Sequence, residues 1–302
     1  MYENENTLPS HYTDAFEANM QHVPQQQGSR LVNLVDSNLN FTKPGDMFNA
    51  DMIGTSEPEE IVERFGKSPD GVIAKSRRVG FFTPYDDGNW LDDIDTAKSL
   101  SDPANATMQA MMWGLERYRD DKIIEALDAP SREGRTGETT VAFPSSQIIA
   151  IDSWTYKRKG DTSTGDAPMT FAKLNRMGVM LDKSEIPGER VVVISSEQLG
   201  QLLTDPVITD REAGVVNSLI NREITRFMNA SWVVSERLPL NAGVRTCFGF
   251  IKPAIMYRGR KLTEAQIVRR PDRKFNWYAY YKGTHGALRR FDKAVVKILC
   301  AE

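Results

Sequence analysis

The first part of the chain lacks the apolar periodicity of a self-contained core. In residues 1–44, apolar side chains occur only at intervals, as at Phe16, Leu31 and Val35, among Asn, Gln and Asp residues. Such a segment cannot bury enough apolar surface to fold alone. We therefore expect it to form an arm that becomes ordered by lying on another surface.

Residues 45–85 have the pattern of a long β-hairpin. Strand-like flanks enclose turn signals such as Pro58, Gly66 and Asp70-Gly71, and apolar residues are sparse between them. Within this segment an acidic stretch precedes a basic one. Because the segment is too polar to be buried within its own subunit, we expect the hairpin to project outward.

A long helix with clear end signals follows. Asp102 offers an N-cap acceptor, Pro103 suits the first helical position, and Pro130 ends the run. We expect a helix over residues 103–127. Apolar residues recur along it at helical spacing, and we interpret them as packing surface. They are Met108, Met111, Met112, Leu115 and Tyr118.

The middle of the chain mixes short helices and strands. Ser195 and Gln198 have the spacing of a capping box, which predicts a short helix through Leu203. The other expected elements are strands at 139–151 (with a disruptive Pro144), 190–195 and 232–235, and helices at 171–181 and 217–228.

The C-terminal part is mostly strand-like, with apolar and aromatic runs between polar turns. The expected strands cover residues 247–257, 266–270, 277–281 and 294–300. The helices are grouped in the middle and the strands gather toward the C-terminus. This distribution predicts an α+β fold.

The composition is that of a folded protein. The 302 residues are 40% hydrophobic and 26% charged, enough for one elaborate domain or two smaller ones. No stretch approaches the roughly 18 uninterrupted apolar residues of a membrane helix. The polar, acidic start is unlike a secretion signal. We expect a protein made and used without export, with no membrane partner.

Candidate chemistry is sparse. Cys247 and Cys300 lie in apolar surroundings and are interpreted as buried free thiols, and the three histidines are scattered. One acidic run could in principle hold divalent ions for a nuclease, although such runs are more often solvated loops or helix caps. We expect no cofactor, no metal and no enzyme activity. The run consists of Asp86, Asp87, Asp92, Asp93 and Asp95.

The net charge of −3 hides a strong asymmetry. Residues 1–135 carry 13 Lys/Arg against 24 Asp/Glu, whereas residues 252–302 carry 13 against 4, so their charges are −11 and +9. The basic end is interleaved with aromatic residues, which is typical of single-strand nucleic-acid platforms and also of an amphipathic sheet with a charged outer face. We favour the sheet, with the opposite charges meeting across interfaces between copies.

With no catalytic constellation and two segments that cannot fold alone, self-assembly is the function that the pattern favours. The order of several short motifs then resembles the major capsid proteins of tailed bacteriophages, which have the Hong Kong 97-like fold. The resemblance covers nearly the whole chain. The residues that carry it are 25–31, Arg77-Arg78, 91–95, 119–127, 190–195, 226–239, 269–272, 286–289 and 295–298.

The resemblance implies a division of the chain into parts. Asn221 and Asn229 stand where relatives usually have glycine, and asparagine tolerates the left-handed backbone that such turns require. The implied parts are an N-terminal arm (1–44), an extended loop (45–85), a peripheral domain (86–167) with a spine helix (103–127), an axial domain (168–250), and C-terminal strands (251–302) that return to both domains.

The resemblance also implies function and location. Copies are expected to form pentamers and hexamers that close into an icosahedral shell around double-stranded DNA, which is enclosed without sequence-specific contacts. The implied partners are a portal protein, a scaffolding protein and a decoration protein. The protein is expected in the virion capsid, after synthesis in the bacterial host cytoplasm. No Lys–Asn crosslink between subunits is expected.

Two sets of contact residues follow from this picture. In the extended loop, charged side chains are expected to pair with opposite charge on a neighbour: Glu57, Glu59, Glu60, Glu63, Arg64, Lys67, Lys75, Arg77 and Arg78. In the arm, the expected contacts are Gln25, Gln26, Gln27 and Arg30.

Three other functions remain open at this point. One is a nanocompartment shell of the encapsulin type, which encloses an enzyme instead of a genome. A second is a metal-dependent nuclease that uses the aspartate run. The third is a monomeric nucleic-acid binder, which would show tight, salt-sensitive binding.

Overall fold

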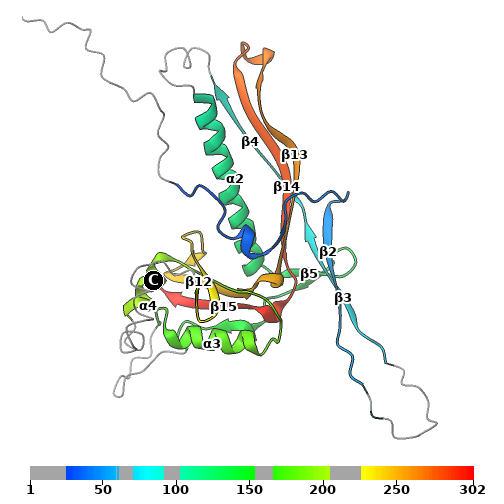
Figure 1. The fold of residues 1–302 in the computed structure, drawn as a ribbon, viewed down its shortest axis with the longest axis vertical. Helices are drawn as coiled ribbons and strands as arrows, with labels where there is room; N and C mark the ends of the chain where they lie inside the picture. Colours follow the sequence, from blue (N-terminus) through cyan, green and yellow to red (C-terminus); the bar gives the residue numbers. More distant parts are fainter. Residues whose placement is uncertain (1–24, 59, 61–70, 92–102, 154–165, 205–225) are drawn as a thin grey trace, which may run out of the picture.

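The computed structural model describes residues 25–58, 60, 71–91, 103–153, 166–204 and 226–302. In these residues helices and three sheets are combined, so the fold is α+β as predicted (Figure 1). No helix in the described part is long and apolar enough to cross a membrane.

The long helix α2 (Pro103–Asp128) forms at the place that its end signals predict. Met111 and Leu115 are buried and pack with Ala279 and Tyr281. Farther along the helix, residues 123–127 contribute side chains to the main core. The prediction was wrong for Met112, which is 39% exposed.

The first sheet is a long ribbon packed along α2 (Figure 1). Its strands, in order, are β1 (Asp36–Asn38), β13 (Ile255–Arg269), β14 (Trp277–Arg289) and β4 (Thr83–Leu91). The Tyr281 hydroxyl donates to the carbonyl oxygen of Met111 at 3.1 Å, which ties the ribbon to the helix. The strands predicted at 266–270 and 277–281 are therefore parts of two longer strands.

The second sheet, called the axial sheet below, carries the main core. Helices α3 (Phe171–Asp182) and α4 (Ser196–Thr204) accompany it, close to their predicted positions. Its strands, in order, are β7 (Ile148–Ile149), β15 (Val295–Ala301), β12 (Val244–Ile251), β8 (Arg190–Ile194), β10 (Ala230–Val234) and β9 (Arg226–Phe227), with β11 (Leu240–Asn241) paired to β12.

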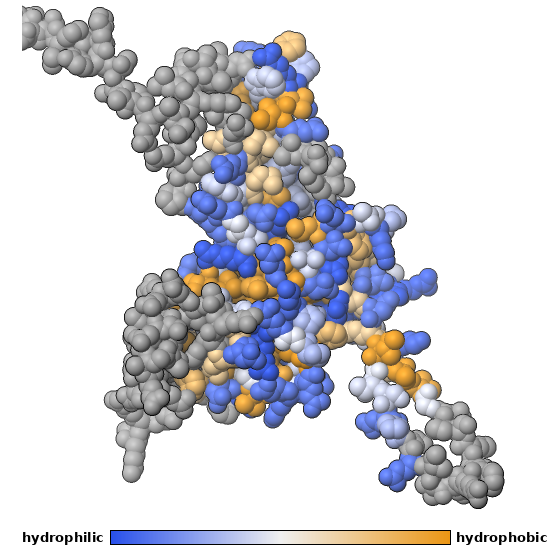
Figure 2. Space-filling view, in the orientation of Figure 1, coloured by the Kyte–Doolittle hydropathy of each residue, from blue (hydrophilic) through white to orange (hydrophobic). Residues whose placement is uncertain are grey.

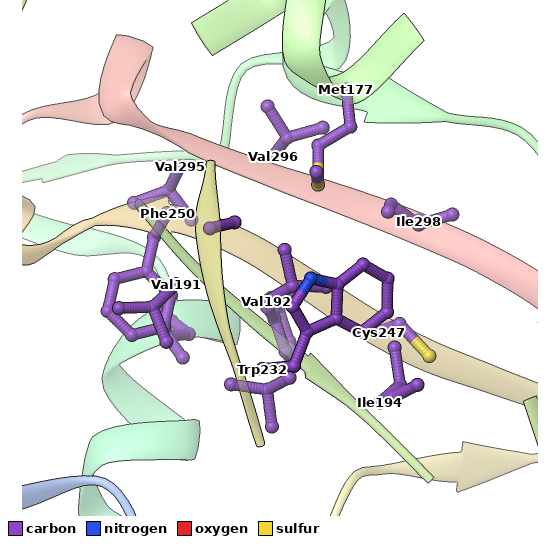
Figure 3. Packing of buried hydrophobic residues seen from close by; sticks show 14 of the residues in the cluster. Met177, Val191, Val192, Ile194, Trp232, Cys247, Phe250, Val295, Val296 and Ile298 are labelled. Atoms are coloured by element: carbon purple, nitrogen blue, oxygen red, sulfur yellow. The ribbon is translucent and has the colours of Figure 1, made fainter. Parts of the chain in front are cut away.

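Buried hydrophobic side chains from several strands of this sheet and from α3 pack against one another (Figure 3). Val191, Val192, Val193 and Ile194 of the central strand β8 are all 0% exposed. A continuous apolar run is what a strand needs when both of its faces are covered. Each such side chain stabilises the fold by about 1.5–3 kcal/mol. Both cysteines are free and buried in the same core, as predicted.

The third sheet continues into the projecting hairpin. Strands β2 (Met47–Ile53) and β3 (Lys75–Phe81) pair antiparallel over their full length, which confirms the predicted hairpin. At its base, β3 pairs with β5 (Ser131–Glu133), and β5 pairs with β6 (Thr139–Val141). The hairpin leaves the body at this small sheet and extends away from it (Figure 1).

Two predicted elements differ from the structure. The region predicted as a strand at 139–151 consists of two short strands and a 3-10 helix after Pro144.

The helix predicted at 217–228 is wrong at its end, where Arg226–Phe227 is a strand. A two-residue turn follows, with Met228 at φ 52° and Asn229 at φ 56°. This geometry suits a tight hairpin, and Asn229 adopts the expected left-handed backbone. Residues 217–225, including Asn221, lie outside the described part.

A buried lysine joins three separate segments of the chain. Lys173 of α3 is 0% exposed, and its ammonium donates to the carbonyl oxygens of Ile151, Ala167 and Leu299 at 3.0, 2.9 and 2.8 Å. Burial lowers the pKa of Lys173 because it disfavours the charged form. Nothing in the amphipathic pattern of α3 predicts this role.

Opposite charges of the two ends meet inside one subunit. Asp36 binds Arg258 at 3.1 Å and Arg290 at 3.0 Å, and Asp128 binds Lys297 at 2.6 Å. The expectation that these charges meet between copies therefore needs a correction, since part of the basic C-terminal region neutralises the acidic part of its own chain. The remaining charge of the hairpin and of the ribbon end is still available to other molecules.

Candidate assembly surface

The projecting hairpin exposes three of the five predicted charged side chains that lie in its described part. Lys75, Glu57 and Glu60 are exposed. Across the hairpin, Arg77 donates to Asp51 at 3.1 Å, and both side chains remain largely in solvent. The hydrogen bond from Arg77 lowers the pKa of Asp51. The other predicted contacts lie outside the described residues: Glu59, Glu63, Arg64 and Lys67.

Arg78 lies on the opposite side of the hairpin from Arg77. It is 8% exposed, and its guanidinium donates to Asp292 at 2.7 Å. Adjacent residues of a strand point to opposite faces, so one arginine faces solvent and the next faces the body. The structure thus places Arg78 in an intrachain ion pair, whereas it was expected to pair with a charge on a neighbouring subunit.

Apolar side chains on the hairpin are as prominent as the charges. Ile53, Val72 and Ile73 are 72%, 95% and 41% exposed. Figure 2 shows hydrophobic surface on this extension, well away from the body. Exposed apolar groups gathered on a projecting element are typical of a protein interface. Val72 and Ile73 were not among the predicted contact residues, although two adjacent apolar residues in a polar loop are a usable sequence signal.

The arm residues bind the spine helix of their own chain. Gln26 donates to Asp120 at 2.6 Å, and the backbone N–H groups of Arg30 and Leu31 donate to the same carboxylate at 3.0 and 3.1 Å. Arg117 donates to the side chain of Gln25 at 2.7 Å. The described part of the arm does lie on another surface, as expected, and for residues 25–31 this surface is α2. Arg30 also donates to the Val234 carbonyl, and Gln27 is exposed.

Asp120 was not recognised as a functional residue from the sequence. It is 0% exposed and accepts hydrogen bonds from side chains and backbone groups about ninety residues away in sequence. A buried carboxylate is tolerated only when donors surround it in this way. Its neighbour Asp121 binds Arg237, so the same turn of α2 also contacts the loop before β11.

The free end of the ribbon combines basic and aromatic side chains. Trp90 stacks near Tyr278 with ring centroids 4.3 Å apart, and Arg269 lies over Trp277 at 4.6 Å. Phe275, in the turn between β13 and β14, is 61% exposed. This is the amphipathic sheet that the composition predicts, and its exposed end is a second candidate contact surface.

The aspartate run is not a loop in its described part. Asp86 and Asp87 lie in strand β4, next to the hydroxyl groups of Tyr280 and Tyr281 at 3.4 Å. This corrects the expectation of a solvated loop or helix caps. Burial and the Asp87 charge raise the pKa of Tyr281. The described residues contain no group of three His, Cys, Asp or Glu that could hold a metal; Asp92, Asp93 and Asp95 lie outside them.

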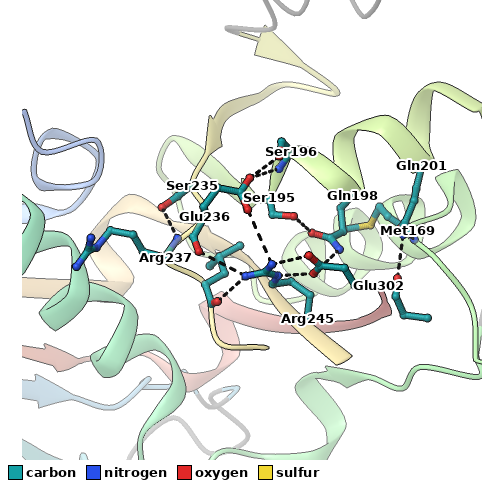
Figure 4. A network of polar contacts seen from close by, with 12 residues as sticks. Met169, Ser195, Ser196, Gln198, Gln201, Ser235, Glu236, Arg237, Arg245 and Glu302 are labelled. Carbon is teal, nitrogen blue, oxygen red and sulfur yellow. Dashed lines mark hydrogen bonds and ion pairs between the residues drawn. The ribbon is translucent and has the colours of Figure 1, made fainter. Parts of the chain in front are cut away.

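A polar network joins α4, β12 and Glu302 (Figure 4). Arg245 makes two hydrogen bonds to Glu302 and donates to the Leu238 carbonyl at 3.0 Å. Gln198 also donates to Glu302, and its side-chain oxygen accepts from Ser195. The two predicted residues are in contact, but through their side chains and not through the side-chain to backbone hydrogen bonds of a capping box. The helix α4 nevertheless begins at Ser196, as predicted.

The comparisons with known proteins agree on one family. The phage capsid protein family model matches residues 8–302. Among curated proteins, no sequence matches the chain. The fold is similar to the capsid structure of cyanophage P-SCSP1u, with a TM-score of 0.73 and 12% identity, covering 96% of this chain and 93% of that one.

Two other solved capsids have the same similarity over almost their whole length. For the capsid of Ralstonia phage GP4 the TM-score is 0.69 at 10% identity, with 97% of this chain and 96% of that chain covered. For the cyanophage Pam1 capsid it is 0.69 at 14% identity, with 99% of both chains covered. The fold is Hong Kong 97-like, and the role of the protein is structural rather than enzymatic. The chain belongs to the phage capsid protein family, and it is a major capsid protein that forms the shell of a tailed phage.

Proposed function

We propose that copies of this protein assemble as pentamers and hexamers into a closed icosahedral shell, held together by the projecting hairpin and the ribbon end. The observation that carries this proposal is the hairpin itself. It extends beyond the body of the subunit and exposes Ile53, Val72 and Ile73. Exposed apolar surface of this kind gains free energy when a neighbouring copy covers it.

In this proposal the predicted parts of the chain have separate tasks. The extended loop (45–85) lies over neighbours, so the entropy lost when it becomes ordered is offset on assembly. The arm (1–44) adds contacts with neighbours beyond those that its residues 25–38 make within their own chain. The peripheral domain (86–167) supplies the spine helix, the axial domain (168–250) meets its copies around the symmetry axes, and the C-terminal strands (251–302) complete both. Exposed Glu57, Glu60 and Lys75 pair with charges on a neighbour.

The assembled shell encloses double-stranded DNA without reading its sequence. The other partners of this shell are a portal protein, a scaffolding protein and a decoration protein. Synthesis takes place in the cytoplasm of the bacterial host. These partners follow from the resemblance to tailed-phage capsid proteins.

Deletion of residues 57–71 tests the role of the hairpin. We expect the full chain to form closed particles in electron microscopy and the deletion variant to remain as soluble subunits or capsomers. The described residues at either end of the deletion are exposed, so the far-ultraviolet circular dichroism and the unfolding midpoint of the subunit should stay unchanged. Normal shells from the deletion variant would contradict the proposal. The nucleic-acid content of the particles separates a viral shell from a nanocompartment.

A further inference from the structure

The base of the hairpin contains a buried ionic cluster. Arg78 from β3 and Arg289 from the end of β14 both bind Asp292, each at 2.7 Å and each to a different carboxylate oxygen. The Arg289 side chain is 0% exposed, and Arg78 and Asp292 retain only 10% and 17% exposure of their side chains. A single carboxylate thus joins the hairpin to the body.

The cluster continues into the spine helix. Arg289 donates to the carbonyl oxygens of Leu127 and Ala129 at 3.2 and 2.7 Å. These carbonyls lie at the C-terminal end of α2, where helical hydrogen bonds run out and a cation is favourable. An unbroken series of hydrogen bonds therefore runs from β3 through Asp292 and Arg289 to α2.

Close packing restricts the hairpin on the same side. Phe48 of β2 is 2% exposed and lies against Gly80 and Gly286. A Cβ atom on Gly80 would overlap its ring, and one on Gly286 would lie 2.8 Å from it. Only glycine leaves room for the ring at these positions. The hairpin base is thus fixed by an aromatic contact and by the ionic cluster.

The cluster has more donors than acceptors. The second carboxylate near Arg78, that of Glu133, is 3.9 Å away. Among the described residues, Nε and Nη1 of Arg78 and Nη2 of Arg289 are buried without a hydrogen-bond partner. Leaving buried donors unpaired costs free energy that a merely stabilising contact would not require. This cost indicates that the ionic cluster has a geometric role.

We propose that Arg78, acting through Asp292 and Arg289, is a positioning residue that fixes the angle at which the hairpin leaves the subunit. All copies then present the hairpin to their neighbours in one orientation. This inference rests on the proposed function, because orientation matters only if the hairpin contacts other copies. Its direct test, however, is made on the unassembled subunit.

Distance measurements between two spin labels test the angle. One label is placed on the hairpin at Ile53→Cys, and the other on α2 at Met112→Cys, since both positions are exposed. The native cysteines are 0% exposed and stay unlabelled. We expect one narrow distance distribution for the labelled parent. With Arg78→Met its width should more than double, because the hairpin can swing about its base.

Arg77→Met is the matched control. Arg77 is the next residue in the same strand, but its ion pair with Asp51 is exposed and does not reach the body. The distribution should stay narrow in this variant. An unchanged width with Arg78→Met would overturn the proposal, as would equal broadening in both variants.

A second variant separates orientation from folding. If Arg78→Met fails to fold, Asp292→Asn keeps the shape of the side chain and weakens both ion pairs, and the same broadening is expected in the folded protein. A narrow distribution in folded Asp292→Asn overturns the proposal. Electron microscopy of the labelled parent tests the proposed function separately. It shows whether shells form, and this result does not depend on the distances measured in the subunit.

Discussion

The axial sheet and the projecting hairpin use the same kinds of residues for opposite purposes. In the axial sheet, the four residues 191–194 of β8 are completely buried by elements of the same chain. In the hairpin, Ile53 and Val72 are 72% and 95% exposed. The first region gains its free energy when one chain folds, and the second can gain it only when chains meet. Identical substitutions in the two regions should therefore affect different measurements.

The largest expected effect is in the axial sheet. Val193→Ser removes two buried methyl groups and places a hydroxyl in the core, so it should lower the free energy of unfolding by about 4 kcal/mol. Urea denaturation of the unassembled subunit measures this loss. A loss below about 1 kcal/mol would mean that the centre of β8 can repack or admit water.

The second prediction concerns His285, which lies where the ribbon contacts α2. His285 is 1% exposed, and burial together with the nearby Lys122 and Arg119 lowers its pKa from 6.5 to about 4. Between these values the unfolded chain binds a proton that the folded chain does not. Stability should therefore be complete above pH 6.5 and fall as the pH drops to about 4, by at most about 3 kcal/mol.

The His285→Gln variant isolates this contribution. Its unfolding free energy should lose the part of the pH dependence that lies between pH 4 and 6.5, while acid unfolding caused by carboxylates remains. If the parent and the variant have parallel stability curves over this range, His285 is not held neutral in the folded chain. The contact between the ribbon and α2 would then admit more water than the core of the axial sheet does.

The smallest effect on stability is expected in the hairpin. Val72→Ser makes the same chemical change as Val193→Ser at a side chain that is 95% exposed. The free energy of unfolding should change by less than about 0.5 kcal/mol. Particle yield should nevertheless fall, and light scattering during assembly measures this. A variant that assembles like the parent would show that Val72 is not covered in the shell.

Local signals in the sequence were sufficient for much of the fold. Asp102, Pro103 and Pro130 bracket α2, and the apolar run at 190–194 identifies β8. The end of the helix predicted at 217–228 failed, because the left-handed turn at Met228 and Asn229 depends on the pairing of β9 with β10. Backbone pairing between strands overrides local helical preference.

The candidate site was harder to predict. Arg77 and Arg78 are chemically equivalent in the sequence, and the flanking residues of β3 do not show which of its two faces meets the body. Asp120 and Asp36 gain their roles from partners about 90 and 222 residues away. Contacts between residues so far apart in the sequence depend on the topology of the fold. Neither composition nor hydrophobic periodicity predicts that topology.

The buried carboxylate of Asp120 has a consequence for the order of events during synthesis. The arm leaves the ribosome before α2, because its hydrogen-bond acceptor is made about 90 residues later. At about 5–20 residues per second, the arm waits roughly 5–20 seconds for that acceptor. It can dock only once the turn of α2 around residue 120 has formed. Until then its polar composition keeps it hydrated, which protects the nascent chain from premature association.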